Sequence, residues 1–467
     1  MTRLGDSPFA GGSPRVPDRP TSSPPAELLR SIFDAAVAGA QPRRATERAV
    51  ARLRPSMDRV WIIALGKAAH AMAAGAVDGL GRRGAQPVGG IVIAADAASP
   101  PHAALETVEG NHPLPGVRSL VAARRLGELC ERVEPGDEVL VLLSGGASSL
   151  AGAPIEGVTT TELAQLNALL LGSGADIGRI NAARKRFSRW GAGRLAAALA
   201  PAHVDCLVVS DVVGDDVATI GSGPCVGDAT TARALSAWLR ESGLWEAMPP
   251  AMTDELDAVE RGERAETPKP GDPALRRVTT RVILGNRDAL RAAAARAAGL
   301  GVRLLGVRGE MRGEAARRGE LIAGRLVAAR AAFRSEPRGP DAASYGCVLW
   351  GGETTVTLGS AADGALGGRC QELSLAAARA LYALGDAARG VTLLAAGTDG
   401  RDGPTDAAGA IVNDETWQAV RAAGRNPARD LAAHDSHRAL DAAGALVRTG
   451  LTGTNVTDVV VGLVSAE

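Results

Sequence analysis

The chain has 467 residues, of which 46% are hydrophobic and 22% charged, a composition typical of globular proteins. Lysine plus arginine number 52 and aspartate plus glutamate also number 52, so the formal net charge is +0. This balance excludes a nucleic-acid binder that relies on a global basic field. The length favours two to three domains over one.

Cysteine usage and the N-terminal segment indicate the compartment. The five cysteines are scattered and form no CxxC pair, which favours free thiols in a reducing environment. No apolar run is long enough to span a bilayer, and the first 25 residues lack the apolar core of a signal peptide. We therefore expect residues 1–25 to be a disordered lead-in and the protein to be cytoplasmic, with no membrane partner and no nucleic-acid partner.

The first half alternates between helical patterns and short apolar strands. The predicted helices cover 26–55, 67–79, 117–133, 160–171 and 178–200, and the predicted strands cover 59–65, 88–94, 138–143 and 204–210. Such alternation is typical of an α/β domain with a parallel sheet and helices on its faces.

The second half repeats this alternation beyond a polar, proline-rich stretch at 262–280, which we interpret as a linker. Its predicted strands cover 281–285, 302–307, 346–350, 391–396 and 458–464, with helices at 287–298, 312–334 and 371–384. We therefore expect two α/β domains, one over 26–265 and a smaller one over 281–467.

Lysine is scarce in this arginine-rich chain. Only Lys67, Lys185 and Lys269 occur. A lysine that survives such a bias marks a place where a compact ammonium is needed and a planar guanidinium does not fit. Lys67 follows a predicted strand and opens a helix, where the helix dipole disfavours a cation, so a functional role is favoured over a merely solvated side chain.

A glycine- and serine-rich loop follows the strand at 138–143. Ser144, Gly145, Gly146, Ser148 and Ser149 lie between that strand and a helix, a setting suited to phosphate binding. The alternative is a tight turn without a ligand. The loop is not a Walker A motif, because the chain contains no GxxxxGK[ST] string.

Acidic residues follow two other predicted strands. Asp211 lies after the strand at 204–210, while Asp399 and Asp402 lie after the strand at 391–396. These carboxylates are candidates for binding a magnesium ion, and Asp211 also for a catalytic base. The alternative is turn and helix-cap chemistry, which uses the same residues. Polar loops after strands in both halves predict a site in a cleft between the domains.

Ten short strings, in order, resemble the glycerate 2-kinase family, whose C-terminal part is the MOFRL domain. The strings are GKAA at 66–69, NHPLP at 111–115, SGGASS at 144–149, INAARK at 180–185, SDVVGDD at 210–216, GSGP at 221–224, GGETTV at 351–356, GGRCQE at 367–372, AAGTDGRDGPTDAAGA at 395–410 and TGTNVTD at 452–458. The resemblance implies transfer of the ATP γ-phosphoryl group to D-glycerate with Mg²⁺, giving 2-phosphoglycerate. It also implies a Rossmann-like N-terminal domain and a smaller C-terminal α/β domain.

The same resemblance implies roles for individual residues. Lys67 and Arg369 are the expected catalytic and anion-binding residues, Asp211 is a further catalytic candidate, and Lys185 is a candidate for binding substrate. We expect Arg369→Ala to leave the melting temperature nearly unchanged, because an exposed arginine in a cleft contributes little to packing.

Two other functions compete with the kinase. A nicotinamide-dependent hydroxypyruvate reductase is one, but the GxGxxG string at 79–84 follows a predicted helix and precedes a strand, the reverse of the dinucleotide fingerprint. The other is a non-catalytic nucleotide-binding module, which would not need Lys67, Asp211, Arg369 and Asp402 together. The sequence leaves the oligomeric state open, a homodimer included.

Overall fold

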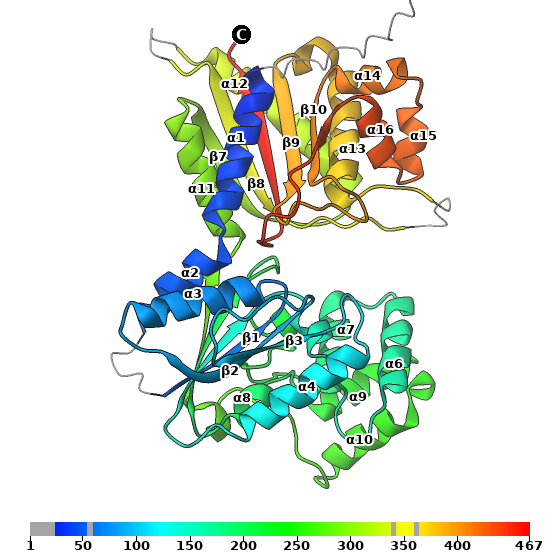
Figure 1. Cartoon of the computed structure of the whole chain (residues 1–467). Helices are drawn as coiled ribbons and strands as arrows, with labels where there is room; N and C mark the ends of the chain where they lie inside the picture. Colours follow the sequence, from blue (N-terminus) through cyan, green and yellow to red (C-terminus); the bar gives the residue numbers. More distant parts are fainter. Residues whose placement is uncertain (1–23, 54–58, 338–341, 359–363) are drawn as a thin grey trace, which may run out of the picture.

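The computed structural model describes residues 24–53, 59–337, 342–358 and 364–467. The expected lead-in at 1–25 falls outside the described residues, except for its last two positions, which begin the first helix. The described chain forms two α/β units stacked one above the other (Figure 1).

The first unit is built on a six-stranded parallel sheet. Its strands are β1 (Val60–Leu65), β2 (Pro87–Ala94), β3 (Leu105–Glu109), β4 (Glu138–Leu143), β5 (His203–Val209) and β6 (Val278–Leu284). They run in the order β3-β2-β1-β4-β5-β6, and every pair is parallel. This is the Rossmann order, as predicted, and its direction of winding reverses between β1 and β4, where ligands bind in such sheets.

Helices cover both faces of this sheet because its strands are apolar on both sides. The covering helices are α2 (Pro42–Val50), α3 (Ala69–Gly81), α4 (Val117–Cys130) and α8 (Arg194–Ala198). Within β1, Ile62 belongs to the buried cluster that contains Met72 of α3, while Ile63 belongs to the cluster that contains Leu126 of α4. The strand's two-residue period thus divides its side chains between two helical layers.

A group of helices beside the sheet has a core of its own. It comprises α6 (Thr160–Gly172), α7 (Ile177–Arg186), α9 (Ala232–Glu241) and α10 (Pro250–Glu260). Leu166, Phe187, Leu239 and Leu256 are buried together there. The helix predicted over 178–200 is wrong in extent: it divides into α7 and α8, and Gly193, with φ +82°, begins α8 in a left-handed conformation.

The second unit contains a mixed sheet. Its strands are β7 (Arg303–Met311), β8 (Tyr345–Gly352), β9 (Val391–Gly397), β10 (Gly409–Asn413), β11 (Leu446–Val447) and β12 (Asp458–Ser465), in the order β11-β10-β9-β12-β8-β7. Only β7 and β8 are parallel; the other pairs are antiparallel.

Two helical layers also enclose this second sheet. Helices α1 (Pro24–Gly39) and α11 (Asn286–Gly299) lie on one face, and α12 (Ala315–Ser335) and α13 (Arg369–Leu384) on the other. Side chains of β12 alternate between the two layers: Val459 and Val461 share a cluster with α1 and α11, and Val460 and Val464 share one with α12 and α13.

Shorter elements complete the chain: α5 (Ala147–Leu150), α14 (Thr416–Ala422), α15 (Pro427–Ala432), α16 (Ser436–Ala442), η1 (Ile220–Ser222), η2 (Trp245–Ala247), η3 (Pro273–Leu275) and η4 (Gly385–Ala388).

The expected division into 26–265 and 281–467 differs from the sheets in two places. The strand predicted at 281–285 exists as β6, but it pairs with β5 in the first sheet, so the stretch 262–280 does not connect the units. Helix α1 packs on the second unit, and the helix predicted over 26–55 ends at Gly39 because Pro42 opens α2. The chain therefore crosses between the units twice, before α2 and after β6 (Figure 1).

Within the described part of the chain, no helix combines the length and the apolar character that crossing a membrane requires.

Packing of α1 on the second unit generates a prediction. Phe33 is fully buried, so Phe33→Ala should lower the free energy of unfolding by roughly 3–5 kcal/mol in urea denaturation. Hydrogen exchange should accelerate in α11 and β12 and stay unchanged in β3. The control is Asp34→Ala on the same helix, whose side chain is 57% exposed. Acceleration confined to the first sheet would contradict this placement of α1.

Candidate active site

The carboxyl ends of β1 and β4 approach each other so closely that glycine is required. Gly66 has φ +120°, and a Cβ there would lie 2.3 Å from the Ser144 Oγ. The Ser144 hydroxyl accepts a hydrogen bond from the Ala68 N–H at 3.0 Å and donates one to the Leu65 carbonyl at 3.3 Å. Ser144 thus joins the two strand ends, and its side chain, predicted to bind phosphate, is buried.

Lys67 and Asp211 meet at the loop that follows β4. The Lys67 N–H donates to the Gly145 carbonyl at 2.9 Å, which fixes the backbone of Lys67 against this loop. A Cβ on Gly145 would lie 1.6 Å from the Asp211 Oδ2, so only glycine admits the carboxylate there. Burial raises the pKa of Asp211, and the charge of Lys67 opposes that rise. Two of the predicted residues of the first unit, Lys67 and Asp211, therefore lie together.

His112 adjoins the same group of residues. A Cβ on Gly146, which has φ +84°, would lie 3.2 Å from the His112 ring and 3.3 Å from the Lys67 Cγ. Loss of hydration and the neighbouring Lys67 lower the pKa of His112. The histidines are too scattered along the sequence to form a zinc-binding pattern, and only the fold places His112 at this site.

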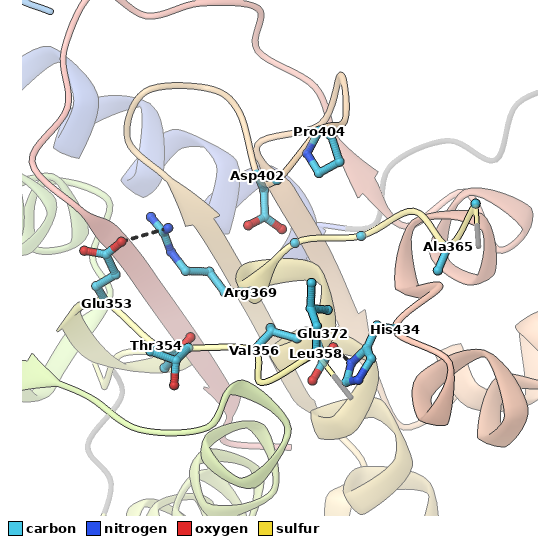
Figure 2. Close-up of a pocket in the computed structure, with 15 residues that line it drawn as sticks. Glu353, Thr354, Val356, Leu358, Ala365, Arg369, Glu372, Asp402, Pro404 and His434 are labelled. Carbon is cyan, nitrogen blue, oxygen red and sulfur yellow. Dashed lines mark hydrogen bonds and ion pairs between the residues drawn. The ribbon is translucent and has the colours of Figure 1, made fainter. Parts of the chain in front are cut away.

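Arg369 is the first residue of α13 and is held by two carboxylates of its own unit. Its Nε and Nη2 donate to the two carboxylate oxygens of Asp458 at 2.6 and 2.8 Å. Its Nη1 lies 2.8 Å from the Glu353 Oε1 (Figure 2). Asp458 is almost fully buried and has little contact with water, so its carboxylate depends on Arg369 as a counter-charge. The premise of an exposed arginine without structural partners is therefore wrong, and we now expect Arg369 to contribute to stability.

Charges from the two units act on one another across the space between them. Burial raises the pKa of Glu353; among the smaller effects, Lys67 lowers it and Asp211 raises it. Burial also raises the pKa of Asp399, which Lys67 and Arg369 lower. Interactions between charges fade beyond about 10 Å at 0.1 M salt. Lys67 and Asp211 of the first unit thus share one electrostatic environment with Glu353, Arg369 and Asp399 of the second.

Asp402, which the sequence predicts to bind a metal ion, instead hydrogen-bonds to backbone N–H groups. Its two carboxylate oxygens accept hydrogen bonds from the Cys370 and Gln371 N–H groups at 3.1 and 2.8 Å. It therefore satisfies donors at the start of α13 and holds that helix against the loop after β9. Burial, with Asp458 nearby, raises the pKa of Asp402 to about 6.

Lys185 is occupied by an internal ion pair. Its Nζ lies 2.9 Å from the Asp228 Oδ1, and the Asp228 side chain is fully buried. A compact ammonium fits this enclosed position, which explains a lysine there without a role in substrate binding.

Two pockets open beside these residues. One, of about 640 Å³, adjoins Arg369 in the second unit and is lined in part by Glu353, Val356, Leu358 and Pro404 (Figure 2). The other, of about 250 Å³, lies in the first unit against the loop that carries Ser148 and Ser149.

Sequence reasoning assigned no role to Glu353 or Asp458. Glu353 lies in one of the polar loops already singled out, but nothing local distinguished it from its neighbours. Asp458 had a stronger signal: it begins an otherwise apolar strand, and a buried carboxylate there requires a cationic partner.

Among the described residues, no three His, Cys, Asp or Glu side chains are grouped closely enough to hold a metal ion.

Comparisons with known proteins agree with this architecture. Residues 28–257 match a domain family described as a domain of unknown function, and residues 346–458 match the MOFRL family. D-glycerate 2-kinase of Thermotoga maritima is 36% identical over 94% of this chain and 98% of its own. The chain belongs to the glycerate 2-kinase family.

Solved structures of this family also match the fold. The crystal structure of glycerate kinase from Thermotoga maritima has a TM-score of 0.80 at 35% identity, covering 94% of this chain and 99% of its own. Human glycerate kinase is 33% identical over 93% of this chain and 92% of its own. An Agrobacterium vitis relative, 38% identical over 93% of both chains, carries instead a provisional hydroxypyruvate reductase name.

The Arg369–Asp458 pair generates a stability prediction. Arg369→Ala leaves the buried Asp458 carboxylate without its partner and should lower the free energy of unfolding by roughly 3–5 kcal/mol. The double variant Arg369→Ala/Asp458→Asn should recover a large part of that loss, because no buried charge remains. Urea denaturation of the three proteins measures both effects. Equal losses in the single and double variants would show that the pair is unimportant.

The raised pKa of Asp402 predicts a pH dependence of stability. With a pKa of about 6 in the folded state, Asp402 keeps a proton that the unfolded chain, with a normal aspartate, releases. Its contribution to stability is complete below about pH 4 and is lost as the pH rises through 6. Between pH 7 and pH 5 the wild type should gain roughly 1 kcal/mol relative to Asp402→Asn in urea denaturation. Parallel pH profiles would contradict this assignment.

Proposed function

We propose that the protein transfers the γ-phosphoryl group of ATP to D-glycerate and forms 2-phosphoglycerate. The observation that carries the proposal is that Lys67 and Asp211 lie together in the first unit, and that their charges act on Glu353, which pairs with Arg369 in the second. Relatives that match nearly the whole chain bear the names D-glycerate 2-kinase and glycerate 2-kinase.

The charged groups suit phosphoryl transfer, which depends on positioning and on neutralising charge. Lys67 is an exposed ammonium at a strand end and can approach the transferred group as a point charge. Arg369 is oriented by Asp458 and Glu353, which use three of its N–H groups and leave others for an anionic ligand. The raised pKa of Asp211 makes it a better acceptor for the proton of the attacking hydroxyl.

The two pockets suit two ligands of different size. The pocket beside Arg369, about 640 Å³, has apolar walls at Val356, Leu358 and Pro404 that can enclose a nucleotide base. In this arrangement the phosphates extend toward Lys67 and the loop from Gly145 to Ser149. The smaller pocket, about 250 Å³, suits a three-carbon acid.

Asp211 and Asp399 have the chemistry to hold Mg²⁺ with the nucleotide. Burial raises the pKa of both carboxyl groups, so a nearby cation would stabilise their charged forms. Mg²⁺ commonly takes one or two carboxylates and completes its shell with phosphate oxygens and water, so two such residues suffice. When bound, the ion would neutralise charge on the phosphates.

The fold argues against the reductase. In a Rossmann domain the dinucleotide fingerprint occupies the first strand-to-helix turn, which here runs from Leu65 to Ala69 and has one glycine and a lysine. The glycine string at 79–84 lies at the end of α3, ahead of β2. A Cβ on Gly79 would lie 2.9 Å from the Val50 side chain, so this glycine serves helix packing.

A kinase assay with Lys67 variants tests the proposal. The wild type should convert ATP and D-glycerate to ADP and 2-phosphoglycerate in the presence of Mg²⁺, with the product identified by phosphorus NMR. Lys67→Ala and Lys67→Arg should each lower kcat by roughly 100-fold or more, because a longer, planar guanidinium on a stem held against Gly146 cannot place its charge where the compact ammonium does.

Lys269→Arg is the matched control. Lys269 donates to the Thr230 carbonyl within the first unit, so the Lys269→Arg enzyme should keep its activity. Oxidation of NADH by hydroxypyruvate without turnover of ATP would instead establish the reductase. Near-normal turnover by Lys67→Arg would remove Lys67 from the mechanism.

A further inference from the structure

Arg184, on α7, is a half-buried arginine without an acidic partner. No hydrogen bond or ion pair of its side chain occurs among the residues that the structure describes, and burial alone lowers its pKa. The next two residues differ: Lys185 pairs with Asp228, and Arg186 pairs with Glu266. Partial loss of water around an unpaired cation is unfavourable, so this position suggests an anionic ligand.

The pocket of about 250 Å³ is the space that Arg184 faces. Its polar lining comes from four segments of the first unit and includes Ser148, Asn167, Asn181 and Ser222. The Asn167 Oδ1 is buried without a hydrogen-bond partner among the described residues. A cation, two amides and serine hydroxyls around a small volume can satisfy a carboxylate and neighbouring hydroxyls.

Gly146 connects this pocket to the reacting groups. It lines the pocket, and a Cβ on it would lie 3.3 Å from the Lys67 Cγ. A ligand held by Arg184 therefore lies in the pocket that Gly146 also lines; Lys67 adjoins Gly146, and Asp211 lies against the neighbouring Gly145.

We propose that Arg184 binds the carboxylate of the acceptor in this pocket and makes the enzyme select hydroxy acids over neutral polyols. This proposal rests on the function proposed above and assigns the acceptor's place in it. The size of the pocket favours a small acid over a triphosphate, whose several charges would require more than one cation. Asn181 and Asn167 can hydrogen-bond to the acceptor's hydroxyl groups.

Arg184→Gln should change the affinity for one substrate and leave the affinity for the other unchanged. The KM for D-glycerate should rise roughly 10- to 100-fold, the loss expected for charge-assisted hydrogen bonds, while the KM for ATP stays unchanged. Glycerol, which lacks the carboxylate, should be used as poorly by the variant as by the wild type. The preference for glycerate over glycerol therefore falls by the same factor.

Arg179→Gln is the matched control on α7. Arg179 is exposed and lies over the Trp238 ring, away from the pocket, so both KM values should match the wild type. Calorimetric titration of D-glycerate without nucleotide gives a readout independent of turnover. Weaker binding to Arg184→Gln supports the assignment even in a protein that transfers no phosphate, which separates failure of this proposal from failure of the kinase function.

Two results would overturn the assignment: a raised KM for ATP with normal binding of D-glycerate, or no change in either. Should Arg184→Gln lower the melting temperature, Arg184→Lys replaces it, because lysine keeps the charge but not the planar fork. That variant should show an intermediate rise in the KM for D-glycerate, and an unchanged value in a well-folded Arg184→Lys protein would also contradict a fork-like contact with a carboxylate.

Discussion

The bidentate pairing of Arg369 with Asp458 fixes the geometry of the second unit's half of the site. Arg369 is the first residue of α13, where the helix dipole disfavours a cation, and the carboxylate of Asp458 offsets that effect at close range. Because Asp458 begins β12, an interior strand between β8 and β9, the arginine is tied to the interior of the sheet. Its guanidinium therefore needs little reorganisation when an anion arrives.

The same end of β12 also holds the connection between the units. Asn286, the first residue of α11, follows β6 after a single glycine, and its Nδ2 donates to the Val456 and Asp458 carbonyls at 2.9 and 3.0 Å. The point at which the chain enters the second unit is thus bonded to the segment that positions Arg369. Any rotation of one unit against the other would therefore have to pivot on this connection and on the one before α2, the two places where the chain crosses between the units.

Local patterns in the sequence predicted an α/β unit with a parallel sheet, and the family resemblance implied its Rossmann-like form, but neither could show which sheet each segment joins. The strand at β6 is evident from its apolar residues, but its pairing with β5 is a long-range contact that no local period encodes. Helix α1 has an apolar face that would pack on either unit. Only tertiary structure shows that Leu29 and Phe33 are buried with β12.

The role of a charged side chain could be predicted from the sequence only where its interaction partner could also be inferred. The scarcity of lysine singled out Lys67 and Lys185; the stem of Lys67 lies against Gly146 below an exposed ammonium, whereas Lys185 is enclosed with Asp228. Scarcity thus reports a geometric constraint and not a function, since Lys185 is explained by Asp228. Asp402 illustrates the same limit, because an acidic residue in a polar loop can cap a helix as readily as it can bind a metal.

Three consecutive residues of α7 show what distinguishes a binding residue from a structural one. Successive side chains of a helix diverge by roughly 100°, so Arg184, Lys185 and Arg186 face three different surroundings. Lys185 and Arg186 each meet a carboxylate of the protein, Asp228 and Glu266. Arg184 meets instead a small polar pocket beside Lys67. The carboxylate of the acceptor would then pair with Arg184 as Asp228 pairs with Lys185, but only while the substrate is bound.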